Sequence, residues 1–217
     1  MAPTGDTLAV KPRFRGRLHQ IAFVISIPAG VALIAFASGA EARVSAVIFA
    51  ASLSGLYGVS AAYHRGRWQA SGERLMRHLD HSMIFVLIAG SYTPITLVAL
   101  RPAWGITLLA LVWTGAAVGV VVTVLRLEQW HRVGFVMYLT LGWLAAVAAP
   151  QLVHALSGAE LALLATGGIL YTVGAILLAC QRPDPLPLTF GYHEVWHTFV
   201  IGAGSCHYAL VFLLVRA

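Results

Sequence analysis

The sequence predicts an all-α integral membrane protein, a seven-transmembrane helix bundle with a cytoplasmic N-terminus and an outside C-terminus. Its composition is 59% hydrophobic and 10% charged, whereas soluble domains carry about 25% charged residues. Seven apolar runs each approach the roughly 20 residues that a spanning helix needs. The basic residues cluster between alternate runs, as they do in cytoplasmic loops. A chain with so little charge has to face lipid over most of its surface.

The seven runs cover, in order, residues 20–39, 44–64, 79–100, 103–125, 132–152, 159–180 and 192–215. Helix is the expected structure because backbone exposed to lipid must satisfy its own hydrogen bonds. Connections such as Arg65 to His78 and Leu127 to His131 are short, which leaves no room for a second domain. We therefore expect a basic cytoplasmic tail over residues 1–18 and one seven-helix transmembrane domain over residues 19–217. A cleavable signal peptide is the alternative for the first run, but its length favours an uncleaved helix.

The orientation follows from the distribution of lysine and arginine. With the N-terminus inside, the inside segments hold 11 of the 14 basic residues and the outside segments hold 3. The positive-inside rule therefore places the N-terminus in the cytoplasm. The net charge of +6 does not indicate nucleic acid, because no basic stripe with interleaved aromatics is present. Membrane lipids, as substrate or ligand, are the expected partners.

Polar side chains interrupt these runs at three places. Ser60 and His64 close the second span, Asp80 opens the third, and His193 and His197 open the seventh. Residues four apart lie on one helix face, about 6 Å apart along the axis. Because all three places lie at the cytoplasmic boundary in this topology, we expect the five side chains to meet at one depth.

Three imidazoles with an open fourth position are typical of a catalytic zinc site, in which water is the fourth ligand. The sequence thus predicts a Zn²⁺ cofactor held by His64, His193 and His197. Neutral histidines leave the charge of the ion undiminished, which lowers the pKa of its water. Asp80 is the predicted catalytic base, and Ser60 is predicted to stabilise an oxyanion. Interfacial residues wetted by lipid headgroups are the alternative, which the coincidence of depth disfavours.

The segment from His193 to His197 also matches HExxH, the zinc-protease signature in which the glutamate is the general base. Zinc proteases usually take a third ligand downstream, but no acid follows Glu194. The third ligand must then come from another span, and His64 is the available donor. Glu194 remains a candidate auxiliary base, although an acid stabilised by the helix dipole is the preferred interpretation.

The other histidines have weaker signals. His19, His131 and His154 lie in or beside predicted loops, where we expect them to face solvent or headgroups. His207 lies 14 residues past His193, about 21 Å along a helix axis. It is too far away to share the metal, and we expect it to be a buried hydrogen-bonding group.

These motifs, taken in order, resemble the bacterial hemolysin III family. They are S-x-x-x-H at the end of span two, Asp80-His81 leading into Ile-Phe-x-Leu-Ile-Ala-Gly-Ser-Tyr-Thr-Pro, and H-x-x-W-H opening span seven. The family is related to the progestin and adipoQ receptors and, more distantly, to alkaline ceramidases. The resemblance implies the same seven-helix fold, zinc on the same three histidines, and roles for Asp80 and Ser60. Relatives in the wider group hydrolyse lipid amides such as ceramide.

The leading hypothesis is a zinc-dependent hydrolase of lipid amides or esters. A non-enzymatic sensor or regulator of membrane lipid, with a structural zinc, is one alternative. The open fourth position beside Asp80 favours the hydrolase, because a structural site is normally closed by a fourth protein ligand. A pore-forming, hemolytic protein is the other alternative. The acids avoid mid-span positions, which disfavours a transport pathway.

Overall fold

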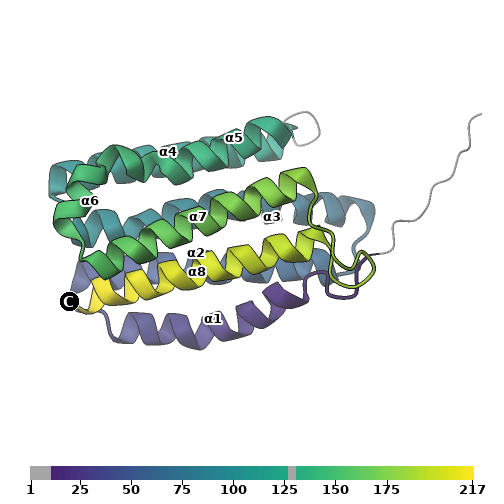
Figure 1. The fold of residues 1–217 in the computed structure, drawn as a ribbon, viewed down its shortest axis with the longest axis horizontal. Coiled ribbons are helices and arrows are strands. Elements are labelled where there is room, and N and C mark those ends of the chain that lie inside the picture. The colour runs from purple at the N-terminus through teal and green to yellow at the C-terminus, as the bar shows by residue number, and fades with distance from the viewer. Residues whose placement is uncertain (1–10, 127–130) are drawn as a thin grey trace, which may run out of the picture.

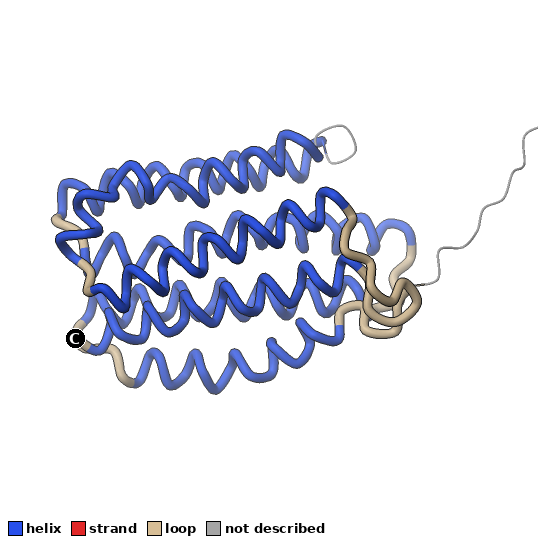
Figure 2. Tube along the Cα trace, in the orientation of Figure 1, coloured by secondary structure: helices blue, strands red, loops and turns tan. Residues whose placement is uncertain are grey.

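The computed structural model describes residues 11–126 and 131–217, which are almost entirely helical (Figures 1 and 2). The elements are α1 (Arg17–Ala35), α2 (Ala40–Arg65), α3 (Ala70–Pro94), the π-helix η1 (Ile95–Ala99), α4 (Pro102–Arg126), α5 (His131–Gly142), the 3₁₀ helix η2 (Trp143–Ala148), α6 (Ala149–Ala155), α7 (Gly158–Cys180) and α8 (Tyr192–Arg216). Within these described ranges, seven helical segments are long and apolar enough to cross a membrane. The predicted seven-helix fold is confirmed.

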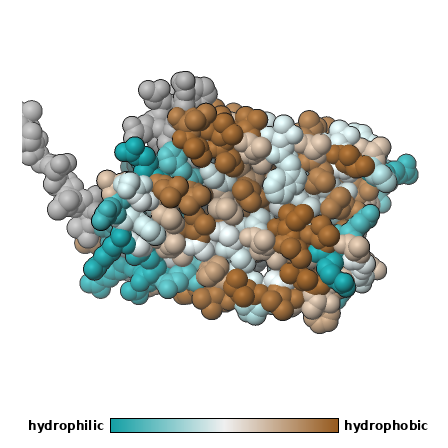
Figure 3. All heavy atoms as spheres, turned by 180° about the vertical axis from the view of Figure 1, so that it is seen from behind, coloured by the Kyte–Doolittle hydropathy of each residue, from teal (hydrophilic) through white to brown (hydrophobic). Residues whose placement is uncertain are grey.

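Successive spans run in opposite directions, and α1–α2, α2–α3, α3–α4 and α7–α8 pack as neighbours. The chain therefore ends on the opposite side of the bundle from the start of α1 (Figure 1). We call the side where α1, α3 and α8 begin the N-terminal end, and the other side the C-terminal end. Apolar residues cover much of the middle of the surface, while hydrophilic residues gather at the N-terminal end (Figure 3).

The structure bears on the predicted segments between and before the spans in two ways. Residues 1–10 of the predicted tail, and residues 127–130 of the connection predicted at Leu127 to His131, lie outside the described residues. The third helix begins at Ala70 rather than at the predicted residue 79. Hydropathy located the apolar part of this helix and missed its polar first turns. Helical hydrogen bonds are internal, so such a helix can continue from lipid into water.

Two spans contain irregular segments, one at the end of the third span and one in the fifth span. The chain changes to π geometry after Pro94, and the fifth span changes to 3₁₀ geometry at Trp143. The Tyr92 hydroxyl donates toward the carbonyls of Leu141 and Gly142, at 3.0 and 2.8 Å, and accepts from the Ala145 N–H at 2.7 Å. It thus satisfies backbone groups that the break in the fifth span frees.

The first helix, α1, packs closely against α2. On α1, one face is buried: His19, Ala22, Ser26, Gly30 and Leu33. This face packs on α2, where Ala50 approaches Gly30 and Ser54 accepts a hydrogen bond from Ser26 at 2.8 Å. Small residues allow this close approach of two helices in a membrane. The packing fixes the start of α1 against the end of α2.

Candidate metal centre

Three histidines converge at the N-terminal end of the bundle. His64 lies in the last turn of α2, and His193 and His197 lie in the first two turns of α8. One ring nitrogen from each lies within 4.8 Å of the others. The Nε2 atoms of His64 and His193 are 3.1 Å apart. The sequence prediction that these three side chains meet across two helices agrees with this geometry.

The burial of the cluster gives a second reason to expect a cation. His197 is only 2% exposed, and its Nδ1 atom has no hydrogen-bond partner among the described residues. Since buried polar atoms normally have a partner, an unsatisfied nitrogen beside two further imidazoles requires an explanation. Neutral imidazole nitrogens are common metal ligands. These three residues could therefore hold a metal ion.

Asp80 and Ser60 line the same cavity as the three histidines. The cavity has a volume of about 280 Å³ and also borders Lys11, Glu73 and His81. Ser60 on α2 and Asp80 on α3 lie close enough in this cavity to interact with each other. All five predicted residues thus share one polar cavity. Asp80 is not one of the three residues whose ligand atoms converge, which fits a group that acts beside a metal.

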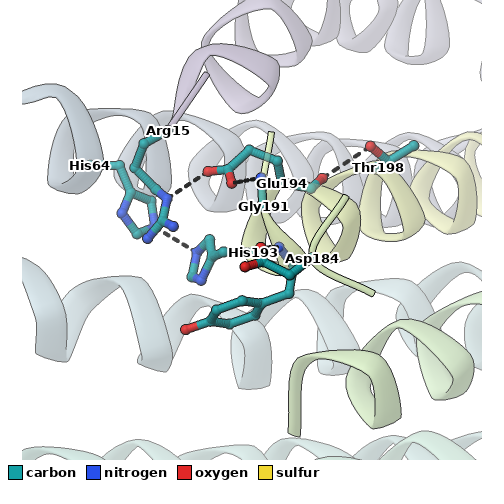
Figure 4. Close-up of polar contacts among 8 residues, drawn as sticks. Arg15, His64, Asp184, Gly191, His193, Glu194 and Thr198 are labelled. Carbon is teal, nitrogen blue, oxygen red and sulfur yellow. Dashed lines mark hydrogen bonds and ion pairs between the residues drawn. The ribbon is translucent and has the colours of Figure 1, made fainter. Parts of the chain in front are cut away.

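Glu194, the acid of the HExxH match, does not face this cavity. It is fully buried, and both of its carboxylate oxygens are engaged (Figure 4). Oε1 accepts a hydrogen bond from Arg15 Nε at 2.6 Å, and Oε2 accepts one from the Gly191 N–H at 2.8 Å. The preferred interpretation, an acid at the N-terminus of its helix, agrees with these contacts. A general base would need a free oxygen beside the attacked group.

The prediction for His19 was wrong. It does not face solvent or headgroups, because it is 2% exposed and stacks on His197 with ring centroids 3.7 Å apart and planes 12° apart. Both of its ring nitrogens lack a hydrogen-bond partner in the described part of the chain. The sequence did contain a signal, the 3–4-residue spacing from His19 through Ala22, Ser26 and Gly30, which marks a packed helix face.

Arg15 is the other residue that the sequence analysis missed. It lies 179 residues from Glu194, and no local pattern relates the two. His154, by contrast, is exposed at the C-terminal end, as predicted. His207 lines a different cavity, as its distance from His193 predicted. It faces the Leu164 carbonyl, but neither ring nitrogen completes a hydrogen bond with the described residues.

This second cavity adjoins the polar one inside the bundle. It has a volume of about 110 Å³, and most of its wall is apolar. Five residues line both cavities: Leu56, Ile84, Tyr138, Trp196 and Val200. A molecule with a polar end and an apolar chain could therefore occupy both. The arrangement suits an amphipathic ligand whose polar end lies at the histidines.

The fold and the site together define a polytopic α-helical membrane protein with a three-histidine cluster at one end of the bundle. Residues 8–208 match the protein family described as Haemolysin-III related. The chain belongs to this haemolysin III family, and it is a multi-pass bacterial membrane protein.

Individual relatives agree with this assignment. The chain is 37% identical over 200 residues to Hemolysin-3 of Bacillus cereus, covering 91% of this chain and 88% of the relative. It is also 37% identical over 196 residues to the Hemolysin-3 homolog of Bacillus subtilis (strain 168), covering 89% of each. The human monocyte to macrophage differentiation factor is 28% identical over 176 residues, covering 76% of this chain and 68% of that protein. This similarity fits the predicted relation to the progestin and adipoQ receptors.

Proposed function

We propose that this protein is a zinc-dependent hydrolase of lipid amides or esters. The observation that carries the proposal is the shared polar cavity, in which three converging histidines lie beside the Ser60–Asp80 pair. Side chains that bind a metal, accept a proton and stabilise an oxyanion are the parts that metal-assisted hydrolysis needs.

The donor set favours zinc over the harder divalent ions. Imidazole suits zinc, copper, iron and nickel, whereas magnesium and calcium prefer oxygen ligands. Zinc binds imidazole nitrogen at about 2.0–2.1 Å, so two ligands of a tetrahedral ion lie about 3.3 Å apart. The 3.1 Å between Nε2 of His64 and Nε2 of His193 is close to this spacing. The three ligand atoms lie within 4.8 Å of one another, so the rings would draw closer together around a bound ion.

A bound zinc ion would supply Lewis-acid polarisation of the substrate carbonyl and would make water a stronger nucleophile. The protein residues do the rest. Asp80 accepts a proton from the attacking water as its oxygen bonds to the carbonyl carbon. Ser60, which lines the cavity beside Asp80, donates its one hydroxyl hydrogen toward the developing oxyanion. The carbon–nitrogen or carbon–oxygen bond then breaks, and the proton held by Asp80 passes to the leaving amine or alcohol.

The adjoining apolar cavity supports a lipid substrate. Its position, directly inward of the histidines, would place an acyl chain among Leu56, Ile84 and Val200 while the carbonyl stays in the polar cavity. Burial of an acyl chain is favourable by about 0.8 kcal/mol for each methylene removed from water. A lipid that enters from the bilayer gains less, because its chain is already in an apolar solvent. Specificity would then depend on the polar cavity.

Incubation of the purified protein with labelled ceramides and phospholipids tests the activity. We expect release of the free acyl chain by the wild type. The Asp80→Asn variant should keep its zinc and lose about 10²–10⁴-fold in turnover, because the base is removed and the ligands remain. Glu41→Gln, an exposed acid at the C-terminal end, is the matched control and should retain activity.

Two outcomes would overturn the proposal. Full activity of Asp80→Asn would remove this residue from the mechanism. A zinc-loaded wild type that binds these lipids and releases no acyl chain would favour the structural zinc of a lipid sensor.

We also propose that the N-terminal end of the bundle faces the cytoplasm across the bacterial inner membrane, in accordance with the 11 to 3 distribution of basic residues. An alkaline phosphatase fused after Ala217 should then be active, and a fluorescent protein that folds only in the cytoplasm should be dark at the same position. The opposite pattern would reverse the orientation.

A further inference from the structure

One short segment, from Arg15 to His19, contacts every part of the chain that carries a predicted metal ligand. It leads into the first turn of α1, which begins at Arg17. Just before it, the N–H groups of Arg13 and Phe14 donate to the carbonyls of Leu188 and Thr189, at 3.1 and 3.0 Å. The segment is therefore fixed to the loop that precedes α8.

The first contact is the ion pair between Arg15 and Glu194. Glu194 lies on α8 between the two ligands His193 and His197, and it is fully buried. Its other oxygen caps the start of the same helix through the Gly191 N–H. In Figure 4 the Arg15 side chain extends from the α1 side to Glu194, next to His64 and His193. A buried carboxylate that loses its cation is strongly unfavourable, so Arg15 determines where the first turn of α8 lies.

The second and third contacts are with two of the histidines themselves, His64 and His197. Gly16 has a φ of 77°, which glycine adopts without strain. A Cβ placed on it would lie 2.7 Å from the Cβ of His64, so the backbone packs directly on this side chain. Three residues later, the His19 ring stacks on His197, with Tyr57 behind it at a centroid distance of 5.2 Å.

We infer that Arg15, Gly16 and His19 are positioning residues, which hold His64, His193 and His197 in the geometry that binds the metal. The inference rests on the metal site of the proposed function and extends that site to α1 and the chain before it. Residues that orient metal ligands typically change metal affinity by 10–100-fold when they are replaced. The Glu of the HExxH match thereby acquires a role, as the anchor for Arg15 on the ligand helix.

A double-mutant cycle tests the ion pair. Zinc affinity is measured by competition with a chromogenic chelator, for the wild type, Arg15→Gln, Glu194→Gln and the double variant. Each single change should weaken zinc binding about tenfold, and the double variant should resemble a single one, because both remove the same contact. Arg15→Lys, which keeps a charged donor, should recover part of the loss.

The matched control is Glu160→Gln. Glu160 caps α7 as Glu194 caps α8, through the N–H of Ser157 at 2.7 Å, and no ion pair of Glu160 is present among the described residues. Its replacement should leave zinc affinity unchanged. Unchanged affinity in Arg15→Gln, or independent and additive losses in the cycle, would overturn the role of the pair.

The stacking contact is tested with His19→Phe and His19→Ala. Phenylalanine keeps a flat ring against His197, so zinc affinity and the visible spectrum of the cobalt-substituted protein should stay close to wild type. Alanine leaves the His197 ring unsupported, so we expect about tenfold weaker binding and a shifted cobalt spectrum, which reports ligand geometry independently of turnover. Wild-type spectra for both variants would overturn the role of His19. A wild type that binds neither ion would instead refute the proposed function.

Discussion

Glu194 at the N-terminal end of the bundle and Glu160 at the C-terminal end begin as the same structural device. Each is the third residue of its helix. Its carboxylate accepts a hydrogen bond from the backbone N–H three residues earlier, that of Gly191 at 2.8 Å for Glu194 and that of Ser157 at 2.7 Å for Glu160. Glu160 is partly exposed, and among the described residues the hydrogen-bond partners of its side chain all belong to Ser157. Glu194 is fully buried and also binds Arg15, 179 residues away.

The difference between the two acids extends to the two ends of the bundle. At the C-terminal end, polar groups complete helix termini: Ser157 with Glu160, and the Arg43 side chain with the Ala37 carbonyl. At the N-terminal end, histidines and acids from α1, α2, α3 and α8 meet in one cavity. Burying polar groups costs free energy unless they are paired. A cluster that bears this cost, at one end only, points to a function that needs it.

The largest expected effect concerns the histidines themselves. His64→Ala or His193→Ala should abolish stoichiometric zinc binding, because two imidazoles remain where the proposed site needs three. His154→Ala changes the same residue type at the exposed C-terminal end and should bind about one zinc per chain, like the wild type. Metal analysis of the purified proteins is the measurement. A wild type without zinc would mean that the buried histidines at the N-terminal end are not a zinc site.

Removal of the metal should come next in size. A ligand at a thousandfold excess over its dissociation constant stabilises a folded protein by about 4 kcal/mol. A strong chelator should therefore lower the thermal unfolding midpoint of the wild type and of His154→Ala. It should leave the midpoint of His64→Ala unchanged, since that variant has no bound ion to lose. A chelator effect of equal size in all three proteins would mean that the stabilising ion binds elsewhere.

The next prediction compares the same substitution, glycine to alanine, at the two ends of the bundle. Gly16 and Gly39 both have positive φ, 77° and 88°, so alanine is strained at either, at a cost of order 1–3 kcal/mol. A Cβ at Gly39, before α2 at the C-terminal end, meets nothing within 4 Å, whereas at Gly16 it meets His64. Both variants should unfold at lower temperature. Gly16→Ala alone should weaken zinc binding, about tenfold, and equal zinc affinity in both would contradict the contact.

The sequence predicted the fold well because hydropathy and charge report the membrane directly. The start of α3 was missed by nine residues, from Ala70 to the predicted 79, because helix and membrane boundaries need not coincide. Topology alone predicted that His64 and the two histidines of α8 would lie at one end, and the structure brings their ring nitrogens together.

The surroundings of these histidines were far less predictable. The Arg15–Glu194 pair depends on how the chain before α1 meets the loop before α8, a long-range contact that no periodicity encodes. His19 was missed for a different reason. Hydropathy treats a histidine near a basic segment as a loop residue, whereas its burial depends on the small-residue face that follows it on α1.

The smallest expected effect isolates the capping that the two ends share. The Ser157→Ala variant removes an N-cap side chain that accepts from the Glu160 N–H, and loss of such a cap typically costs about 1 kcal/mol. This should lower the unfolding midpoint slightly without changing zinc affinity, because α7 begins at the end of the bundle away from the histidines. Thermal unfolding and the chelator competition, run side by side, measure both quantities.

If a cap at the C-terminal end also altered zinc affinity, general loosening of the bundle would explain the Arg15 and His19 variants equally well. Unchanged zinc affinity in Ser157→Ala would therefore mean that any effect of those variants comes from their contacts with α8.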